Sequence, residues 1–236
     1  MRRETMTLSE RHIKAYDHDA PARPTAHKDR ISSQVSVGLS IAIPEESTLV
    51  LYPQDDRRAN KFNVSAALRT SLAPEEQPDV VLRDAREIVI NDKPGDVVIF
   101  PGSSMWHLRR DAAGAVHLYL KFNDFDSDPL GEDPATPQRE EGTRAALDEE
   151  DLAERVPVPA RRLDTITRQY TRDGWSQIVQ ASVWERNPIT LSPEQVDLLW
   201  ALDARRSVRA LSANGDGAAV EAAVRGLAER GVVDLL

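Results

Sequence analysis

The chain has 236 residues and a formal charge of −9, from 39 acidic and 30 basic side chains. This length has room for a medium and a small domain, and the acidic balance argues against DNA or an anionic membrane as the main partner. The sequence has no cysteine, which excludes disulfides, thiolate zinc sites and cysteine nucleophiles and leaves His, Asp and Glu as metal ligands. No apolar run reaches the roughly 18 residues of a membrane span, and the opening segment lacks the apolar core of a signal peptide. We therefore expect a soluble, cytoplasmic protein.

Residues 31–125 carry short apolar runs of mostly period two, broken by Pro, Gly, Asp and Asn, which is typical of strands and turns. Val35, Val37 and Leu39 begin one such alternation. We expect about six strands here, a size that suits a sandwich or barrel. The named strands are 31–43, 47–52, 80–90, 97–100 and 116–122, with a polar stretch of helical tendency at 65–76 after the second.

Residues 124–159 are acidic, rich in proline and poor in apolar side chains, which predicts an exposed linker with some short helix. A hairpin with Asp173 and Gly174 at its turn is expected to follow, although 175–184 also fits a helix.

Residues 189–236 change to a helical period. Ser192 to Gln195 form a capping box with proline at the first helical position, and further helices are expected at 207–211 and 218–230, followed by a terminal strand. This order resembles a winged-helix domain, or its relatives that hold leader peptides during peptide modification. Acidic residues outnumber basic ones here, which argues against a DNA reader.

Two segments carry the residues with metal chemistry. His27-Lys28-Asp29 precedes the first long strand, and this short pattern alone is weak evidence. The second segment, 93–107, is more specific: a Gly-Asp turn begins the apolar strand 97–100, a Pro-Gly turn ends it, and His107 follows.

Together these segments resemble the Fe(II)/2-oxoglutarate-dependent oxygenases of the phytanoyl-CoA and prolyl-hydroxylase type, over residues 27 to 123. The resemblance implies a mainly β N-terminal domain, a double-stranded β-helix of jelly-roll or cupin-like type. It implies that His27, Asp29 and His107 bind one Fe(II), with an open face for 2-oxoglutarate and O2. The expected domains are 1–127 for this metal-binding domain, 128–188 for the acidic linker and hairpin, and 189–236 for a small α-rich winged-helix-like domain.

The sequence departs from this family in two places. Many members carry an arginine for the far carboxylate of 2-oxoglutarate shortly after a glycine, where this chain has Val116 and His117 after Gly114. Lys121 is the first substitute, and Arg109 and Arg110 are the next. In addition, only 26 residues precede His27, which leaves a minimal barrel, a barrel completed by a partner subunit in a homodimer, or a mistaken start.

Each candidate also has a simpler interpretation. His27 fits a solvated loop, His107 a buried hydrogen-bonded histidine at a strand edge, and Asp29 the cap of a turn. Lys121 fits a solvated strand position. A second set of polar residues either lines a pocket or lies on the surface: Asn60, Asn63, His117 and Tyr119.

The leading hypothesis is an Fe(II)/2-oxoglutarate-dependent oxygenase that hydroxylates a small molecule or a peptide-bound amino acid, with the C-terminal domain holding substrate or partner. One alternative is a non-catalytic cupin-like binding or scaffold protein, favoured by the missing arginine. Another is a transcription regulator with a ligand-binding barrel and a winged helix, which would need duplex binding.

Overall fold

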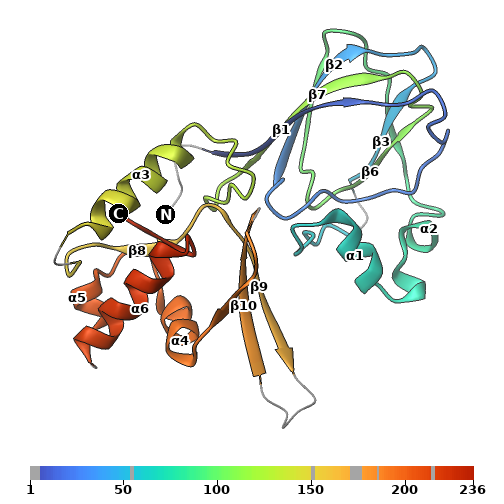
Figure 1. The fold of residues 1–236 in the computed structure, drawn as a ribbon. Coiled ribbons are helices and arrows are strands. Elements are labelled where there is room, and N and C mark those ends of the chain that lie inside the picture. The colour runs from blue at the N-terminus through green and yellow to red at the C-terminus, as the bar shows by residue number, and fades with distance from the viewer. Residues whose placement is uncertain (1–5, 54–55, 150–151, 171–176, 185, 214–215) are drawn as a thin grey trace. The chain divides into compact units, whose positions relative to one another are not determined.

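The computed structural model describes residues 6–53, 56–149, 152–170, 177–184, 186–213 and 216–236, and it divides into two compact units. The first unit is Met1–Asp126 and the second is Ser127–Leu236. Strands dominate the first unit, and the longest helices lie in the second (Figure 1). Within the described ranges, no helix is long and apolar enough to cross a membrane.

The larger sheet of the first unit has four antiparallel strands in the order β1-β7-β2-β5. They are β1 (Thr7–Ala15), β7 (Val116–Asn123), β2 (Val35–Ala42) and β5 (Val97–Phe100). Strand β7, the last of the unit, therefore lies between the first two (Figure 1). This order brings Lys121 of β7 beside the chain that connects β1 to β2, which contains His27 and Asp29.

The smaller sheet has the order β4-β3-β6, formed by β4 (Ile88–Ile90), β3 (Thr48–Tyr52) and β6 (Trp106–Arg110). His27 extends this sheet beyond β6 through an isolated antiparallel bridge to His107. Helices α1 (Ser65–Ser71) and α2 (Pro78–Val81) and the 3-10 turn η1 (Pro74–Glu76) connect β3 to β4.

The apolar core of the first unit belongs mainly to the smaller sheet. Val50, Tyr52 and Trp106 are at most 2% exposed and pack with Leu108 and Leu82. The opposite side of β3 packs against Phe100 and Met105. The larger sheet is different, because the side chains that it turns inward are mostly polar, among them Ser36, Ser40, His117 and Lys121.

Several expected strands are confirmed. Strand β5 has the expected bounds, and β2, β3 and β7 lie within or extend the expected ranges. The expected strand at 80–90 is wrong over its first part, because Pro78 begins helix α2 and only Ile88–Ile90 pair with β3. Strands β1 and β6 were not expected. The unit is mainly β and is consistent with a cupin-like fold.

In its described residues, the second unit combines short sheets with four helices. Strands β9 (Leu163–Tyr170), β10 (Gln177–Val183) and β11 (Ile189–Leu191) form one antiparallel sheet, and β8 (Pro157–Pro159) pairs with β12 (Val233–Leu235). The helices are α3 (Ala135–Leu147), α4 (Pro193–Ala201), α5 (Val208–Leu211) and α6 (Gly217–Glu229).

The structure differs from the expected linker at 128–188. Ala146 and Leu152 are at most 1% exposed and lie in one core with Val224 and Leu227 of α6. Asp128, which is fully buried, accepts hydrogen bonds from the backbone N–H groups of Glu132 and Asp133 and from the Thr136 hydroxyl, so this segment is ordered locally by a buried carboxylate. A hairpin, β9–β10, is present, and its expected Asp173-Gly174 turn lies outside the described residues.

The expected capping box of the C-terminal helices is confirmed. The Ser192 hydroxyl accepts from the Gln195 backbone N–H, and the Gln195 side chain accepts from the Ser192 backbone N–H. Helix α6 begins one residue before its expected start, because Asp216 caps it by accepting from the N–H groups of Ala218 and Ala219.

Candidate metal centre

His27 and His107 are held side by side by the backbone. Each donates its N–H to the carbonyl of the other at 2.9 Å, as in one rung of an antiparallel ladder. The two rings are consequently neighbours, with centroids 4.3 Å apart, and the ring of Phe100 packs edge-on against His107 at 4.8 Å. This pairing brings together two imidazoles that are 80 positions apart in the sequence.

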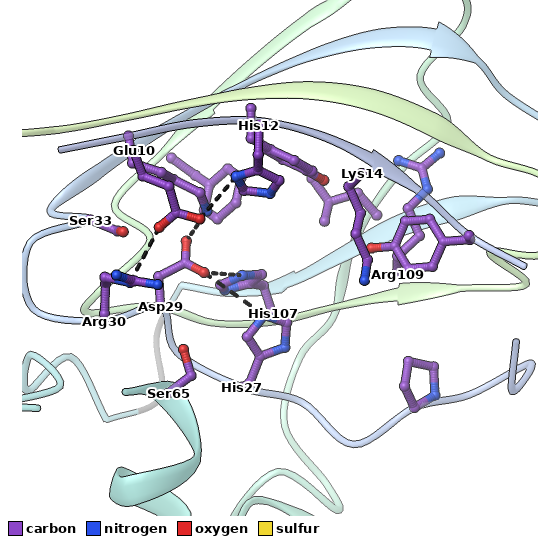
Figure 2. A pocket seen from close by; sticks show the side chains of 16 residues that line it. Glu10, His12, Lys14, His27, Asp29, Arg30, Ser33, Ser65, His107 and Arg109 are labelled. Atoms are coloured by element: carbon purple, nitrogen blue, oxygen red, sulfur yellow. Dashed lines mark hydrogen bonds and ion pairs between the residues drawn. The ribbon is translucent and has the colours of Figure 1, made fainter. Parts of the chain in front are cut away.

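Asp29 completes a three-residue cluster. Its Oδ1 atom lies 3.9 Å from Nε2 of His27 and 3.8 Å from Nε2 of His107. One ligand atom from each residue can be chosen so that all lie within 4.8 Å of one another, and among the described residues this is the one such group of His, Asp and Glu. Figure 2 shows the carboxylate facing both imidazoles. The intervening Lys28 points away and donates to the carbonyls of Asp56 and Arg58.

The second oxygen of Asp29 is held by protein donors. Lys121 Nζ lies 2.5 Å from Oδ2, and the Ser36 hydroxyl donates to the same atom at 2.6 Å. Lys121 also contacts Ser36 Oγ at 3.1 Å. The Asn60 side chain donates to the Asp29 carbonyl, which fixes the backbone as well. The carboxylate is therefore oriented so that one oxygen faces the histidines and the other faces its donors.

Gly102 makes room for this carboxylate. A Cβ atom at this position would lie 2.3 Å from Asp29 Oδ2 and 2.1 Å from Ser36 Oγ, well inside contact distance. The Gly102 carbonyl also accepts the Asp29 backbone N–H at 2.9 Å. The Pro-Gly turn after β5 therefore has a direct steric reason, because any side chain there would displace the carboxylate.

Hydrogen bonding and burial favour neutral imidazoles beside an ionised carboxylate. The Met105 carbonyl lies 2.9 Å from Nδ1 of His107, which favours the proton on Nδ1 and leaves the Nε2 lone pair toward Asp29. Burial lowers the pKa of His107. The side chain of His27 is half exposed, and its pKa is lowered by partial desolvation at the cavity wall and by the neighbouring His107. Burial opposes ionisation of Asp29, but Lys121 and the two histidines outweigh it and lower its pKa.

The cluster lies on the wall of a cavity of about 350 Å³ in the first unit (Figure 2). Its lining includes four cationic side chains, two carboxylates, and the rings of Tyr16, Phe100 and Tyr119. In a chain with a formal charge of −9, this local excess of cations favours an anionic ligand. The charged lining residues are Lys14, Arg30, Arg109, Lys121, Glu10 and Asp29.

Arg109 reaches the same cavity from β6, two residues after His107, so both side chains lie on one face of the strand. It is 4% exposed; Nη1 donates to both oxygens of Asp92 at 2.9 and 3.1 Å, and Nε donates to the Ser47 hydroxyl at 2.9 Å. His117 stands beside this pair, with Nε2 3.5 Å from Asp92 Oδ2. Burial and Arg109 lower the pKa of His117.

The other site residues predicted from the sequence fall into two groups, those that line the cavity and those that do not. Arg110 points to a different side of β6, pairs with Glu87 at 2.8 Å and does not line the cavity. Tyr119 lines the cavity, and His117 is buried behind it in a stacked arrangement with its ring. Asn60 is fully buried and supports Asp29 rather than lining the cavity.

Sequence reasoning missed the cavity residues of β1. Glu10, His12 and Lys14 line the cavity from alternate positions, and Glu10 pairs with Arg30 at 3.2 Å. Their period-two spacing was the available signal, but the segment contains few apolar residues and so does not read as a strand. Ser36 was also missed, because a serine in an apolar strand carries no signal of its role.

No family model and no curated protein matches the chain. One matching solved structure is a "novel N-substituted L-amino acid dioxygenase in complex with alpha-KG" from Burkholderia ambifaria AMMD, with 14% identity and a TM-score of 0.33. The match covers 49% of this chain and 47% of that one, so the chain spans about half the length of its neighbour. A likeness this weak carries no weight for the activity of this chain.

Proposed function

We propose that this protein is a mononuclear Fe(II)/2-oxoglutarate-dependent oxygenase in which His27, Asp29 and His107 hold the metal. The observation that carries the proposal is the convergence of two imidazole nitrogens and one carboxylate oxygen within 4.8 Å at a cavity wall. Two histidines and one carboxylate on one side of an iron, with the remaining positions open, are the donor set of non-haem Fe(II) oxygenases.

The geometry fits an ion after a small contraction. Metal–ligand bonds of about 2.1 Å place neighbouring ligand atoms about 3 Å apart. The observed separations from Asp29 Oδ1 are 3.8 and 3.9 Å, so each side chain needs to move by less than the length of one bond. The donors are also in suitable protonation states, because the pKa directions favour neutral imidazoles and an ionised carboxylate.

The surrounding residues prepare the donors. Lys121 and Ser36 hold Oδ2 of Asp29 and leave Oδ1 for the metal, while Met105 fixes the tautomer of His107. An Fe(II) ion bound there would supply the redox chemistry that couples oxidation of 2-oxoglutarate to hydroxylation of a substrate. The protein's part is to orient the ligands, bind the anionic cosubstrate and limit access of water.

We assign the far carboxylate of 2-oxoglutarate to Arg109 rather than to Lys121. Lys121 is engaged with the proposed metal ligand itself at 2.5 Å. Arg109 lines the same cavity, and its Nη1 and Nε donors are taken by Asp92 and Ser47, whereas its Nη2 makes one long contact of 3.5 Å with the Ser47 carbonyl. A guanidinium with a donor to spare suits a carboxylate.

We further propose that the first unit is a double-stranded β-helix of jelly-roll type. The strand orders support this: β1-β7-β2-β5 in one sheet and β4-β3-β6 in the other, with His27 extending the second. For the second unit we retain a winged-helix-like fold as a proposal, supported by α4, α5 and α6 followed by strand β12. A role in holding substrate or partner is proposed for that unit.

The substrate we propose is a small molecule or one amino-acid side chain of a peptide. A cavity of about 350 Å³ is at the small end of ligand pockets, so 2-oxoglutarate leaves little room for more than a small group beside it. Four cationic and two acidic lining residues favour a polar rather than an aliphatic substrate.

Anaerobic titration tests this function. Fe(II) and then 2-oxoglutarate are added to the purified chain, and the weak visible charge-transfer band of the chelate is recorded, followed by succinate release on admission of O2. The parent should show the band, His107→Ala should lose it, and Arg109→Gln should raise the 2-oxoglutarate concentration needed for half-saturation by about 10-fold or more. Absence of the band in the parent contradicts the proposal.

A non-catalytic cupin-like binding protein is the second candidate, because the two cationic candidates for the cosubstrate are both paired with acids, Lys121 with Asp29 and Arg109 with Asp92. In that case small anions should bind with the same affinity in the presence and absence of Fe(II), and no succinate should form under air.

A further inference from the structure

The outer face of the larger sheet of the first unit is apolar. In an antiparallel pair, residues directly opposite each other point to the same side of the sheet, so the register identifies which side chains share this face. Ile13, Leu118, Leu39 and Val97 form one row across all four strands, and Leu120, Val37 and Ile99 form most of the next. Leu8, Phe122, Val35 and Val116 complete what we call the apolar sheet face.

These side chains are open to solvent. Ile13 is 67% exposed, Ile99 65% and Val97 55%, and every other residue of the apolar sheet face is partly exposed rather than buried. Ile41, at the irregular end of β2, adds a further exposed aliphatic side chain at 45%. Apolar side chains scattered singly are ordinary on a protein surface, but a contiguous set on four adjacent strands indicates an interaction surface.

The alternation explains why this face is apolar while the inside is polar. The intervening residues of the same strands lie on the inward side of the sheet, where some of them line the cavity. They are Glu10, His12 and Lys14 in β1, Ser36 and Ser40 in β2, and His117, Tyr119 and Lys121 in β7. The sheet thus places its polar side chains on the protein side and its aliphatic side chains on the solvent side. A sheet stabilised only by its own unit would have the reverse pattern.

Charge on this face is sparse. Arg11, which is paired in register with Leu120, is the one charged side chain in the rows described above, although the whole chain carries −9. A face with so little charge can meet an identical face without like-charge repulsion at the contact. It also offers no charge pattern by which a basic or acidic partner would be selected.

The area is sufficient for self-association. Four strands about 4.8 Å apart and about seven residues long, at about 3.3 Å per residue, give a flat footprint of roughly 400 Å². Two copies therefore bury roughly 800 Å² of flat area, and their projecting side chains raise the accessible area to the order of 1,000 Å² that a specific interface needs. Homodimer contacts of this size are typically enriched in apolar side chains.

We propose that the apolar sheet face is a homodimer interface, in which two copies of the chain pack these sheets face to face about a twofold axis. Two sheets in such contact pack about 10 Å apart, as in the core of a β-sandwich. This inference does not depend on the metal, because the interface lies on the opposite side of the sheet from the cavity.

Sedimentation velocity of the full chain over a wide range of concentrations tests the proposal. The expected result is a reversible species of twice the 26.2 kDa chain mass that dissociates on dilution. Val97→Glu and Ile13→Glu, on two different strands, should each raise the dimer dissociation constant by at least about 100-fold, because each places two unpaired carboxylates in the contact. A parent that stays monomeric up to high micromolar concentration overturns the proposal.

Val89→Glu is the matched control. Val89 is a strand valine, 44% exposed, on β4 in the other sheet. Its substitution should leave the dissociation constant within a factor of about two. If Val97→Glu and Val89→Glu weaken the dimer equally, or if neither weakens it, any self-association involves another surface and the proposal is overturned.

A labelling experiment avoids the introduction of charge. The chain has no cysteine, so Val97→Cys and Val89→Cys each carry a single thiol. Maleimide should modify Val97→Cys several-fold more slowly at concentrations where the dimer predominates than after dilution, while the rate for Val89→Cys should not change. A concentration-independent rate for Val97→Cys contradicts the interface.

Discussion

Lys121 Nζ lies 2.5 Å from Oδ2 of Asp29, and both side chains are almost inaccessible to water. The lysine therefore forms an ion pair with the carboxylate that faces the two histidines, instead of extending into the cavity as a free cation. Its Nζ also lies over the ring of Tyr119, 4.9 Å from the ring centroid.

Replacement of this lysine should destabilise the protein and weaken metal binding together. Lys121→Met leaves a buried carboxylate with Ser36 as its remaining side-chain donor, so we expect the free energy of unfolding to fall by about 2–4 kcal/mol and metal affinity by about 10-fold or more. Lys121→Arg, which keeps a cation at this position, should lose less of the stability and less of the metal affinity than Lys121→Met. Chemical denaturation and Co(II) titration measure the two effects. Lys14→Met, which removes a more exposed cavity lysine, is the control and should change the free energy of unfolding by less than about 1 kcal/mol.

The same pair predicts a pH dependence. The pKa of Asp29 is depressed in the folded state, so its stabilising contribution is present above its unfolded pKa of about 3.9 and is lost as the pH falls below that value. The stability gap between the parent and Lys121→Met should therefore be constant near neutral pH and narrow in acid, once Asp29 of the folded variant takes up a proton. A gap that widens in acid would show that the lysine acts elsewhere.

Substitution by alanine should destabilise the protein at Gly102 and stabilise it at Gly142. Gly102→Ala forces a Cβ against Asp29 and Ser36, and we expect a loss of about 2–4 kcal/mol together with weaker metal binding. Gly142 lies inside helix α3 with open space around it, so Gly142→Ala should stabilise by about 0.5–1 kcal/mol. Thermal unfolding of both variants measures this contrast. Equal tolerance of both substitutions would show that the turn has no steric role.

His117 should make the protein sensitive to mild acid. Burial and Arg109 depress its folded pKa, so the unfolded chain binds a proton that the folded protein does not, and stability falls as the pH drops below about 6.5. His117→Phe should reduce the slope of stability against pH between about 5 and 6.5 by up to 1.4 kcal/mol per pH unit. His18→Phe, at an exposed loop position, provides the matched control. If the slope of stability against pH is the same in His117→Phe as in the parent, the lowered pKa of His117 in the folded protein is contradicted.

The sequence predicts the three candidate ligands better than it predicts their surroundings. His27 and Asp29 are local neighbours, and the turns around β5 mark His107, so short-range patterns are sufficient to find them. That Lys121 contacts Asp29 depends on β7 lying beside β2, a long-range pairing that local patterns do not determine.

An alternation of apolar and polar residues is also limited in what it can predict. The alternation of Val35, Val37 and Leu39 predicts a strand with one apolar face, but it does not tell which face is inside. In this sheet the polar side chains of the alternation point inward. Strand β1 was missed for a related reason, because its inward side chains are polar and it contains few apolar residues. Strand β6 was missed because Arg109 and Arg110 make it look exposed, whereas Arg109 is buried by its pairing with Asp92. The acidic composition of 128–159 likewise concealed the buried Asp128 and Leu152.

Metal stoichiometry and affinity, measured by anaerobic Fe(II) titration with elemental analysis, test the central claim most directly. The parent and His18→Ala should each bind one ion per chain, while His27→Ala, Asp29→Ala and His107→Ala should each lose at least about 100-fold in affinity and remain folded by circular dichroism. Binding of equal strength in the parent and in folded Asp29→Ala and His107→Ala, or no binding in the parent, would contradict a metal centre at these residues.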